Sequence, residues 1–370
     1  MNLTRAARVA IVGGGIGGLV CARVLQLHGR SVTVFEREPA FDARPQGGTL
    51  DLHPDTGQAA LRAADLLDRF HALSRPEGQE WRAVEHTTAA ALEHEWPPGD
   101  EGAGEEDRPE IDRGHLRGLL LDSLAPGTVR WGHAVGKALP LLDGSCRLVF
   151  ADGTTEDFDL VVGADGAWSR VRAAVSEALP GYTGVTFVET GFDDSDVRHP
   201  DLARLVGPGT LVAKSGSTML FAQRNSNGHI RAYVAFRAPL DWHTAAGLDL
   251  DDAAAIRTYL SQRLDGWAEG LRYAVLDGDH DFVHRPLFAL PVPHVWEHVP
   301  GVTLLGDAAH LMPPLGVGAN HALLDGTDLA QALIREERVD DAVRAYEELM
   351  LPRSSELAKQ CAEGLENLVP

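Results

Sequence analysis

The sequence predicts an α/β fold in which a parallel sheet, covered by helices, is interrupted by an antiparallel sheet and followed by a C-terminal helix. Three observations predict this arrangement. Residues 8–36 read as strand, helix and strand; residues 183–237 contain short strands separated by hairpin-type turns; and a buried strand returns at Val302–Leu305. Strands that alternate with helices favour a parallel sheet, whereas consecutive short strands favour an antiparallel one.

The first of these patterns is a compact βαβ unit. Arg8–Val12 predicts a strand that runs directly into the glycine-rich segment Gly13–Gly18. Apolar residues then recur at helical spacing as far as Leu27, and Gly29 offers a stop. Ser31–Glu36 predicts a second strand of the buried, parallel kind.

The middle of the chain gives further elements. We expect a helix within Leu61–Leu73, β structure in Trp81–Trp96, a helix capped by Asp112 and reaching Leu124, and strands at Arg147–Phe150 and Asp159–Val162. The acidic, proline- and glycine-rich stretch Pro97–Pro109 is typical of a solvated loop, and we assign it no function.

The antiparallel region and the C-terminal third complete the prediction. We expect strands at Thr210–Ala213, Met219–Ala222 and Ile230–Phe236, then helices at Asn320–Ile334, Asp341–Leu351 and beyond Pro352. The 370 residues exceed the roughly 250–300 that one core holds. We therefore assign residues 1–75, 106–180 and 280–340 to the parallel-sheet domain, residues 76–105 and 181–279 to the antiparallel-sheet domain, and residues 341–370 to the C-terminal helix.

Composition and charge exclude several classes of protein. The 33 Lys and Arg residues against 54 Asp and Glu residues give a formal net charge of −21, which disfavours binding to nucleic acid or to an anionic membrane. No stretch approaches the roughly 18 consecutive apolar residues that span a bilayer, and the N-terminus lacks the cleavage site of a secretory signal. Three scattered cysteines make neither a disulfide framework nor a zinc site. We expect a cytoplasmic protein that is a monomer or a weak homodimer.

Gly13, Gly15 and Gly18 form the Gly-x-Gly-x-x-Gly pattern of a dinucleotide-binding turn. The first glycine permits a tight turn, the second lets the backbone approach a diphosphate, and the third lets helix and strand pack closely. Glu36 follows Gly15 by 21 residues and can accept hydrogen bonds from ribose hydroxyls. We add the neighbouring Ile16 and Arg37 to the candidate cofactor residues. The pattern does not separate FAD from NAD(P), and a glycine-rich turn without a ligand is the alternative.

A second constellation spans Gly306–Asn320. Asp307 stands at the end of a buried strand, Pro313 and Pro314 preset the loop that follows, and glycines then expose backbone N–H groups. The helix that begins near Asn320 would direct its positive end at a ligand. A reduced flavin carries negative charge on one edge of its ring, so this arrangement suits a flavin. A tight strand–loop–helix connection would explain the glycines but not the acid and the diproline together.

Gly13–Gly18, Asp159–Gly166 and Gly306–His310 resemble, in order and spacing, the three signatures of the class A FAD-dependent aromatic monooxygenases, which have the p-hydroxybenzoate hydroxylase fold. The resemblance covers essentially the whole chain. Within this family, Gly47–His53, Pro109–Arg113 and Gly306–Pro314 are most similar to the tetracycline-inactivating flavin monooxygenases. The resemblance implies a Rossmann-like FAD-binding domain with an inserted antiparallel-sheet substrate domain.

The resemblance also implies roles for individual residues. By this resemblance, Asp307 binds the ribityl chain of FAD, Arg113 and Asp51 lie beside FAD, and Arg44 takes part in handling NADPH. Asp165 would help to place flavin and nicotinamide, and the flavin ring would be lined by Gly316, Gly318, Ala319 and Asn320. Carboxylates suit polyol hydroxyls and arginines suit phosphates. The alternatives are surface ion pairs for Arg44 and Asp51 and a helix-surface salt bridge for Arg113.

The implied activity is that of an NAD(P)H-dependent FAD monooxygenase. NADPH or NADH would reduce FAD, O2 would add to the reduced flavin as a C4a-hydroperoxide, and a planar polycyclic or phenolic molecule would be hydroxylated. Thr210 and Arg231 replace two residues that help to bind tetracycline in those relatives, so the identity of the substrate stays open. Phe221 and Pro314 are further candidates for substrate binding. No catalytic acid or base is assigned. Baeyer–Villiger insertion or epoxidation, and a non-oxygenating FAD protein, are the alternatives.

Two smaller signals receive structural interpretations. His310 invites the role of a general base, but as part of the Gly306–His310 motif we expect it to be structural. Asp277–His284 contains ligand types that suit zinc or manganese. No second cluster in the sequence completes a site, and a polar turn before a strand explains these residues, so we expect no metal.

Overall fold

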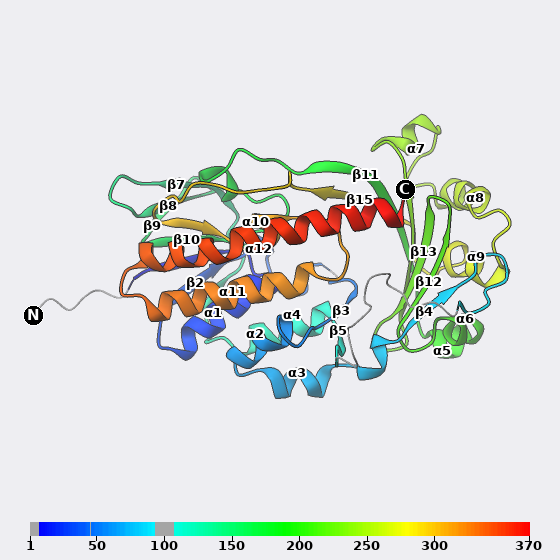
Figure 1. Cartoon of the computed structure of the whole chain (residues 1–370), viewed down its shortest axis with the longest axis horizontal. Coiled ribbons are helices and arrows are strands. Elements are labelled where there is room, and N and C mark those ends of the chain that lie inside the picture. Colours follow the sequence, from blue (N-terminus) through cyan, green and yellow to red (C-terminus); the bar gives the residue numbers. More distant parts are fainter. Residues whose placement is uncertain (1–6, 45, 93–106) are drawn as a thin grey trace, which may run out of the picture.

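The computed structural model describes residues 7–44, 46–92 and 107–370. Predictions that fall on residues 1–6, 45 and 93–106, including most of the acidic stretch, lie outside the described residues. The first of two bodies is built on a five-stranded parallel sheet in the order β16-β10-β1-β2-β6 (Figure 1). Its strands are β1 (Val9–Val12), β2 (Val32–Phe35), β6 (Val129–Arg130), β10 (Leu160–Gly163) and β16 (Val302–Leu304). The predicted Rossmann-like sheet is thereby confirmed.

Two helices far apart in the sequence pack tightly on this sheet. A β-carbon on Gly17 of α1 (Ile16–Leu27) would lie 2.7 Å from the carbonyl oxygen of Ala322 in α11 (Gly318–Arg335). A β-carbon on Gly326 of α11 would lie 2.3 Å from the Gly17 carbonyl oxygen. Only glycines permit this approach of the two backbones. The contact fixes the N-terminal glycine-rich turn beside the segment that leads into α11.

The second body is a six-stranded sheet in the order β15-β11-β14-β13-β12-β4, antiparallel except where β4 joins it. Its strands are β4 (Trp81–Val84), β11 (Gly181–Phe192), β12 (Thr210–Ser215), β13 (Thr218–Arg224), β14 (Ile230–Arg237) and β15 (Val283–Ala289). The hairpins at Ser215-Gly216 and Asn225–Gly228 are confirmed. The sequence assigns residues 280–289 to the parallel-sheet domain, but β15 pairs with β11, because the sequence of a strand does not reveal its partner.

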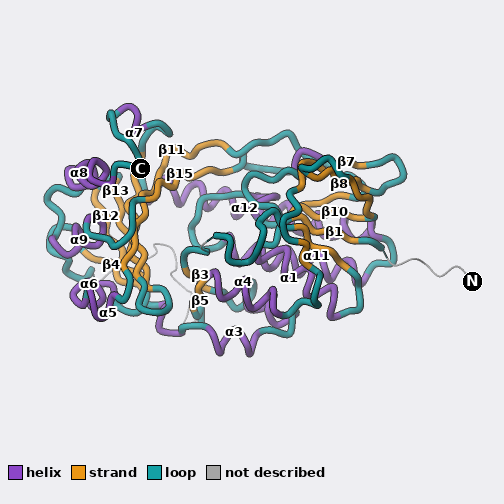
Figure 2. Tube along the Cα trace, turned by 180° about the vertical axis from the view of Figure 1, so that it is seen from behind, coloured by secondary structure: helices purple, strands orange, loops and turns teal. Residues whose placement is uncertain are grey.

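The two faces of the six-stranded sheet have different surroundings. One face, carrying Val188, Phe192 and Val234, packs against short helices in a separate apolar core. These helices are α5 (Ser195–Arg198), α6 (Pro200–Val206), α7 (Trp242–Ala245), α8 (Ala253–Arg263) and α9 (Glu269–Leu276), which the sequence did not predict. Figure 1 and Figure 2 show α5, α6, α8 and α9 on the outer side of the sheet. The other face, called the inner face below, is directed toward the parallel-sheet body.

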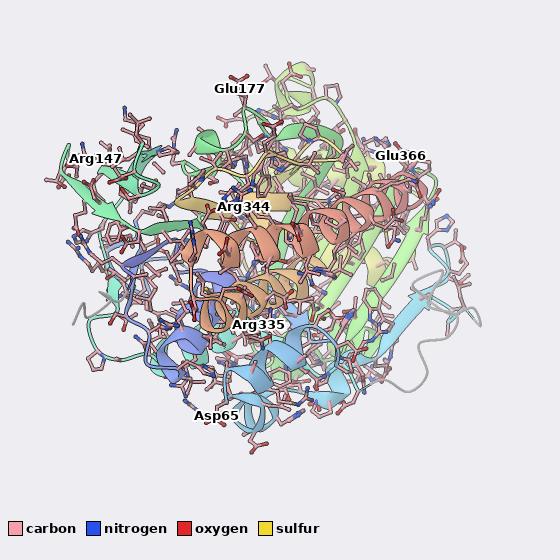
Figure 3. The ribbon with its side chains drawn as sticks, turned by 60° about the vertical axis from the view of Figure 1, so that its left-hand side comes forward. Asp65, Arg147, Glu177, Arg335, Arg344 and Glu366 are labelled. Carbon is pink, nitrogen blue, oxygen red and sulfur yellow. The ribbon has the colours of Figure 1, made fainter. Side chains whose placement is uncertain are left out.

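A single long helix, α12 (Val339–Leu368), connects the two bodies. The prediction of two helices separated at Pro352 is wrong, since Pro352 lies inside α12. The hydroxyl groups of Ser354 and Ser355 donate to the Leu351 carbonyl oxygen, and apolar contacts continue on both sides of the proline. Near the end of α12, Leu365 packs with Val212 and Met219 on the inner face. Figure 3 labels Arg344 near the start of α12 and Glu366 near its end.

The remaining elements pack on the parallel-sheet body or lie between the two bodies. The predicted helix within Leu61–Leu73 is split at Asp65, which has φ of +56°. The elements are α2 (Gly57–Ala63), α3 (Leu67–Leu73), a 3-10 turn (Pro76–Gln79), α4 (Arg113–Asp122), the ribbon of β3 (Thr49–Asp51) and β5 (Glu110–Asp112), the sheet of β7 (Val135–Pro140), β8 (Cys146–Phe150) and β9 (Thr155–Phe158), a 3-10 turn (Arg172–Ala174) and α10 (Asp307–His310). None of the helices in the part of the chain that the structure describes combines the length and apolarity needed to cross a membrane.

Candidate active site

The register of the parallel sheet brings three distant motifs to one edge. Val12 of β1 pairs with Phe35 of β2 and with Gly163 of β10, and Gly163 pairs with Leu304 of β16. Counted along the chain, the five strands lie in the order 3-2-1-4-5. Sheets of this kind bind ligands at the carboxyl edge where the order reverses, here between β1 and β10. The residues that follow the four strands at this edge include Gly13, Glu36, Asp165 and Asp307.

The glycine-rich turn combines a crowded position with an open one. Gly13 has φ of +108°, and a β-carbon there would lie 2.3 Å from the Ala164 carbonyl oxygen. A β-carbon on Gly18 would lie 2.5 Å from the Gly13 carbonyl oxygen. At Gly15 no atom lies within 4 Å of a β-carbon, so space remains over the N-terminus of α1, which begins at the buried Ile16. A diphosphate needs this open approach to the free N–H groups of the first turn.

Glu36 lies against the turn, where the sequence predicts it. Its two carboxylate oxygens accept hydrogen bonds from the backbone N–H groups of Gly14 (2.9 Å) and Glu38 (3.0 Å). The buried Arg117 of α4 donates to the Gly14 carbonyl oxygen at 2.8 Å and lies 3.6 Å from the Glu36 carboxylate. Each carboxylate oxygen retains a lone pair that a ribose hydroxyl can use. Arg117 is not among the predicted residues, because a charge on an amphipathic helix usually faces solvent.

The two predicted acids of the neighbouring strands differ in how they are used. The Asp165 carboxylate accepts from the Ser169 hydroxyl (2.5 Å) and from the backbone N–H groups of Arg170 (2.6 Å) and Val171 (3.3 Å). It therefore closes its own turn, and burial raises its pKa. Asp307, the first residue of α10, is half-buried, and its carboxylate has no hydrogen-bond partner among the described residues. Only Asp307 has its full acceptor capacity available for a polyol chain.

A buried network holds the loop that presents Asp307. The Arg172 guanidinium donates to the carbonyl oxygens of Ala308 (2.8 Å) and Asp307 (3.0 Å). His310 Nε2 lies 2.6 Å from Asp325, whose carboxylate also accepts from Arg353 of α12 at 2.9 Å. Burial opposes protonation of His310, but the Asp325 charge outweighs it and raises the pKa of His310. The structural interpretation of His310 agrees with this geometry. The other network residues carry no local sequence signal, since their partners lie on other elements.

The β3–β5 ribbon brings the remaining cofactor candidates together. Asp51 ends β3 opposite Glu110, and Arg113 follows β5 directly. Asn320 donates to the Asp51 carbonyl oxygen at 2.8 Å, and its Oδ1 accepts from the backbone N–H of His53 at 2.9 Å. The side chain of Asn320 thus joins the ribbon to α11 rather than facing a ligand. The exposed side chain of Arg113 has no hydrogen-bond or ion-pair partner among the described residues, so its guanidinium is available to a ligand.

The loop before α11 lies next to Asp51. A β-carbon on Gly316, which has φ of +88°, would lie 3.9 Å from Asp51 Oδ1. Gly318, Ala319 and Asn320 form the first turn of α11, whose N–H groups have no partners within the helix. Pro314 is exposed at the start of this loop. Asp51 itself also lies 3.0 Å from His53, the kind of ion pair foreseen as the alternative.

Two further cofactor candidates, Arg37 and Arg44, lie on the surface. Arg37 and Arg44 are both exposed, and both lie near one oxygen of Glu38, at 3.6 Å and 3.4 Å. Exposed pairs of this kind contribute about 0–1 kcal/mol to stability. Neither arginine is fixed in place by the fold.

The substrate candidates lie on the inner face of the six-stranded sheet. Thr210, Phe221 and Arg231 belong to β12, β13 and β14, and the pairing register places all three on this face. Arg231 and Arg285 both bind the carboxylate of Glu189, Arg285 through a 2.9 Å hydrogen bond. Thr210, however, has no exposed surface and lies 3.5 Å from the Gln223 amide, so it supports the sheet instead of facing a ligand.

Comparisons with known proteins decide the family. A family model described as an FAD-binding domain matches residues 6–258 and 298–360. The chain belongs to this FAD-binding family. It is 31% identical to monooxygenase asqM of Emericella nidulans over 89% of this chain and 84% of that protein. It is also 31% identical to 3-amino-4-hydroxybenzoate 2-monooxygenase of Streptomyces cremeus, over 96% of this chain and 86% of that protein.

Solved structures share the fold of this FAD-binding family member. Klebsiella pneumoniae HpxO, complexed with FAD and uric acid, has a TM-score of 0.82 at 21% identity and covers 100% of this chain and 91% of its own. Tetracycline destructase Tet(55) has a TM-score of 0.75 at 20% identity and covers 99% and 91%. The resemblance to class A flavin monooxygenases is confirmed. The protein is an FAD-dependent monooxygenase of the aromatic hydroxylase type, and the open turn at Gly15 and the unpaired groups of Asp307 and Arg113 fit its cofactor.

Proposed function

We propose that this monooxygenase uses NADPH or NADH, with O2, to insert one oxygen atom into a planar phenolic or polycyclic molecule. The observation that carries the proposal is the position of residues 47–51. A β-carbon on Gly47 would lie 2.8 Å from Arg231 Nη1 on the inner face, while Asp51 adjoins Gly316 of the loop before α11. One short segment thus separates the polar groups of the substrate sheet from the predicted flavin loop. A substrate on the inner face would be within reach of the cofactor.

The chain's own residues position the reactants. When bound, FAD accepts electrons from a reduced nicotinamide and activates O2. The N-terminus of α1 and Glu36 would hold its diphosphate and ribose, Asp307 its ribityl chain, and the first turn of α11 its ring. Arg113 would neutralise negative charge on the cofactor, and Arg44 would meet the nicotinamide dinucleotide. Asp165, in this proposal, shapes the turn beside them.

The charges of the inner face favour an acidic substrate group. Two arginines, Arg231 and Arg285, face the single carboxylate of Glu189, which leaves an excess of positive charge. Burial and the nearby Glu189 raise the pKa of Tyr233 to about 12, so its hydroxyl stays protonated and able to donate. Phe187 and Phe221, with ring centroids 5.8 Å apart, supply an apolar surface beside them. We therefore propose a flat ring system with an ionised phenol, enol or carboxylate group.

The test is a coupled assay of the purified protein with FAD. NADPH or NADH oxidation is measured with aromatic polyketides, tetracyclines and hydroxylated benzoates, and products are identified by mass. A substrate should raise nicotinamide oxidation and yield a product about 16 mass units heavier, as expected for one oxygen atom. Substrate-independent oxidation, with no product and only hydrogen peroxide, would contradict the proposal and favour the non-oxygenating FAD protein.

Baeyer–Villiger insertion and epoxidation give the same gain of mass. The structure of the product distinguishes these reactions from hydroxylation. Baeyer–Villiger insertion, for example, converts a ketone into an ester, whereas hydroxylation leaves the carbon skeleton unchanged. The domain assignment, a cytoplasmic location and a monomeric or weakly dimeric state belong to the same proposal. Size-exclusion chromatography with light scattering tests the last of these.

A further inference from the structure

We propose that Asp193, His229 and His280 form a site for one divalent transition-metal ion at the end of the six-stranded sheet. The three residues come from different segments: Asp193 follows β11, His229 closes the β13–β14 hairpin, and His280 precedes β15. One ligand atom of each lies within 4.8 Å of the other two. This proposal departs from the sequence-based expectation of no metal. That expectation considered only His280 and its neighbours in the sequence. The fold adds His229 and Asp193, which precede His280 by 51 and 87 positions.

The distances and donor types suit such an ion. His229 Nδ1 and His280 Nε2 lie 2.9 Å and 3.0 Å from different oxygens of Asp193. Ligand atoms around a tetrahedral Zn²⁺ are about 3.3 Å apart, given metal–ligand distances of about 2.0–2.2 Å. Two imidazoles and one carboxylate are a common set for zinc and related ions. Asp193 and His280 are both about half exposed (51%), which leaves room for water in the remaining coordination position.

The fold prepares these three positions through a second layer of contacts. Both imidazole rings lie over Gly191, where a β-carbon would come within 3.0 Å of His229 and 3.2 Å of His280. Asp279 accepts from the Asp193 backbone N–H at 2.9 Å, and Thr190 donates to the His280 carbonyl oxygen at 2.8 Å. Such supporting contacts orient metal ligands.

An ion bound at this site would also affect the β13–β14 hairpin beside the candidate cofactor residues. The hairpin that carries His229 also contains Ser226, whose backbone N–H donates to both Asp112 oxygens at 3.2 Å. Asp112 immediately precedes Arg113, a candidate FAD residue. An ion that joins the ends of β11, the hairpin and the segment before β15 would hold this hairpin against the cofactor region. An ion that binds only the folded protein would raise its free energy of unfolding.

The experiment uses untagged holoenzyme, treated with EDTA and titrated with ZnCl2 by isothermal calorimetry. We expect one Zn²⁺ per chain and a rise of several degrees in Tm that EDTA reverses. His229→Ala and His280→Ala should each weaken Zn²⁺ binding at least about tenfold, and so should Asp279→Asn through the second layer. His71→Ala, an exposed histidine on α3, is the control and should bind as the wild type does.

Asp193→Asn keeps the shape of the side chain, with one acceptor oxygen and an NH2 donor in place of the two oxygens that contact His229 and His280, but removes the ionised ligand. It should fold normally and lose Zn²⁺ binding, and it keeps the test valid if a histidine variant is unstable. Unchanged stoichiometry and affinity in Asp193→Asn, or no saturable binding by the wild type, would overturn the proposal and leave a hydrogen-bonded cluster. The readout is independent of oxygenase activity, so failure of one proposal does not mimic failure of the other.

Discussion

The carboxyl edge of the parallel sheet and the inner face of the antiparallel sheet present polar groups in opposite ways. At the edge, Asp307 has no polar partner among the described residues, and the turn at Gly15 is open. Arg113, which follows the β3–β5 ribbon, also has no polar partner among these residues. On the inner face, Arg231 and Arg285 share the single carboxylate of Glu189, so each of these groups already has a partner within the protein although one positive charge is in excess. The cofactor edge is thus arranged for a ligand of fixed chemistry. In the function proposed above, the inner face binds the substrate and must therefore exchange internal pairs for contacts with that ligand.

This difference predicts separable effects of mutation. Changes at the edge should alter FAD retention without changing discrimination among substrates. Changes on the inner face should alter KM while FAD stays bound, because no paired group there belongs to the predicted cofactor contacts. A variant in either region that changed FAD retention and KM together would contradict the comparison.

The largest effect is expected at Gly13, and Gly15 is its matched partner. Gly13→Ala should destabilise the fold by about 3 kcal/mol or more, because it combines a left-handed backbone with a β-carbon 2.3 Å from a carbonyl oxygen. Gly15→Ala should keep the wild-type Tm, since nothing lies near its β-carbon, but should weaken FAD binding by obstructing the diphosphate. Thermal unfolding and flavin fluorescence measure the two effects. Equal losses of stability in both variants would contradict this division.

The next effect concerns pH and Glu110 of the ribbon between the two regions. Burial raises the pKa of Glu110 from 4.5 to about 7. Since the folded protein holds this proton more tightly than the unfolded chain, its contribution to stability is full below pH 4.5 and is lost as pH rises to about 7. The loss is at most about 3 kcal/mol. Glu110→Gln should therefore be more stable than wild type at pH 8 and similar at pH 5, in urea unfolding with excess FAD. A pH-independent difference would refute this assignment.

The third effect separates the two acids of the edge. Asp307→Ala should weaken FAD binding about tenfold to hundredfold, the range for one hydrogen bond to a charged group, with little change in apoprotein stability. Asp165→Ala should instead lower Tm, because it leaves three hydrogen-bond donors of the turn without their acceptor. FAD titration monitored by fluorescence and thermal unfolding distinguish them. Asp341→Ala, an exposed residue of α12, is the control.

The edge was largely predictable from the sequence because its chemistry is local. Gly13–Gly18, Glu36 and Asp307 each adjoin a strand end, and a parallel sheet collects strand ends at one edge. The residues that stabilise this edge were not predictable, since the contacts of Arg117, Arg172 and Arg353 depend on how separate elements pack. Pro352 misled the helix prediction, because contacts along α12 outweigh the local cost of a proline.

The inner face was harder to predict from the sequence than the carboxyl edge of the parallel sheet. Its character depends on the register of five strands, β11 to β15, and a slip of one residue in a strand would turn the side chains of that strand to the other face. Arg231 was predicted, but its partner Glu189 lies 42 positions away in the sequence, and Arg285, which binds the same carboxylate, lies 54 positions from Arg231. The same reason concealed Asp193 and His229 beside His280. Residues that act together across strands leave no pattern along the chain.

The smallest predicted effect tests whether the inner face acts on substrate alone. Arg285→Ala should raise KM for a phenolate or carboxylate substrate about tenfold, the loss of one charge-assisted hydrogen bond, while kcat and FAD affinity stay unchanged. Stability should change by less than about 1 kcal/mol, because the Arg285 side chain is 55% exposed and a pair so exposed contributes little. Arg257→Ala removes a similarly exposed arginine from α8, on the outer side of the sheet, and should leave KM unchanged. If Arg285→Ala instead released FAD, the two regions would be one site, because a group paired only with Glu189 would then contribute to holding the cofactor.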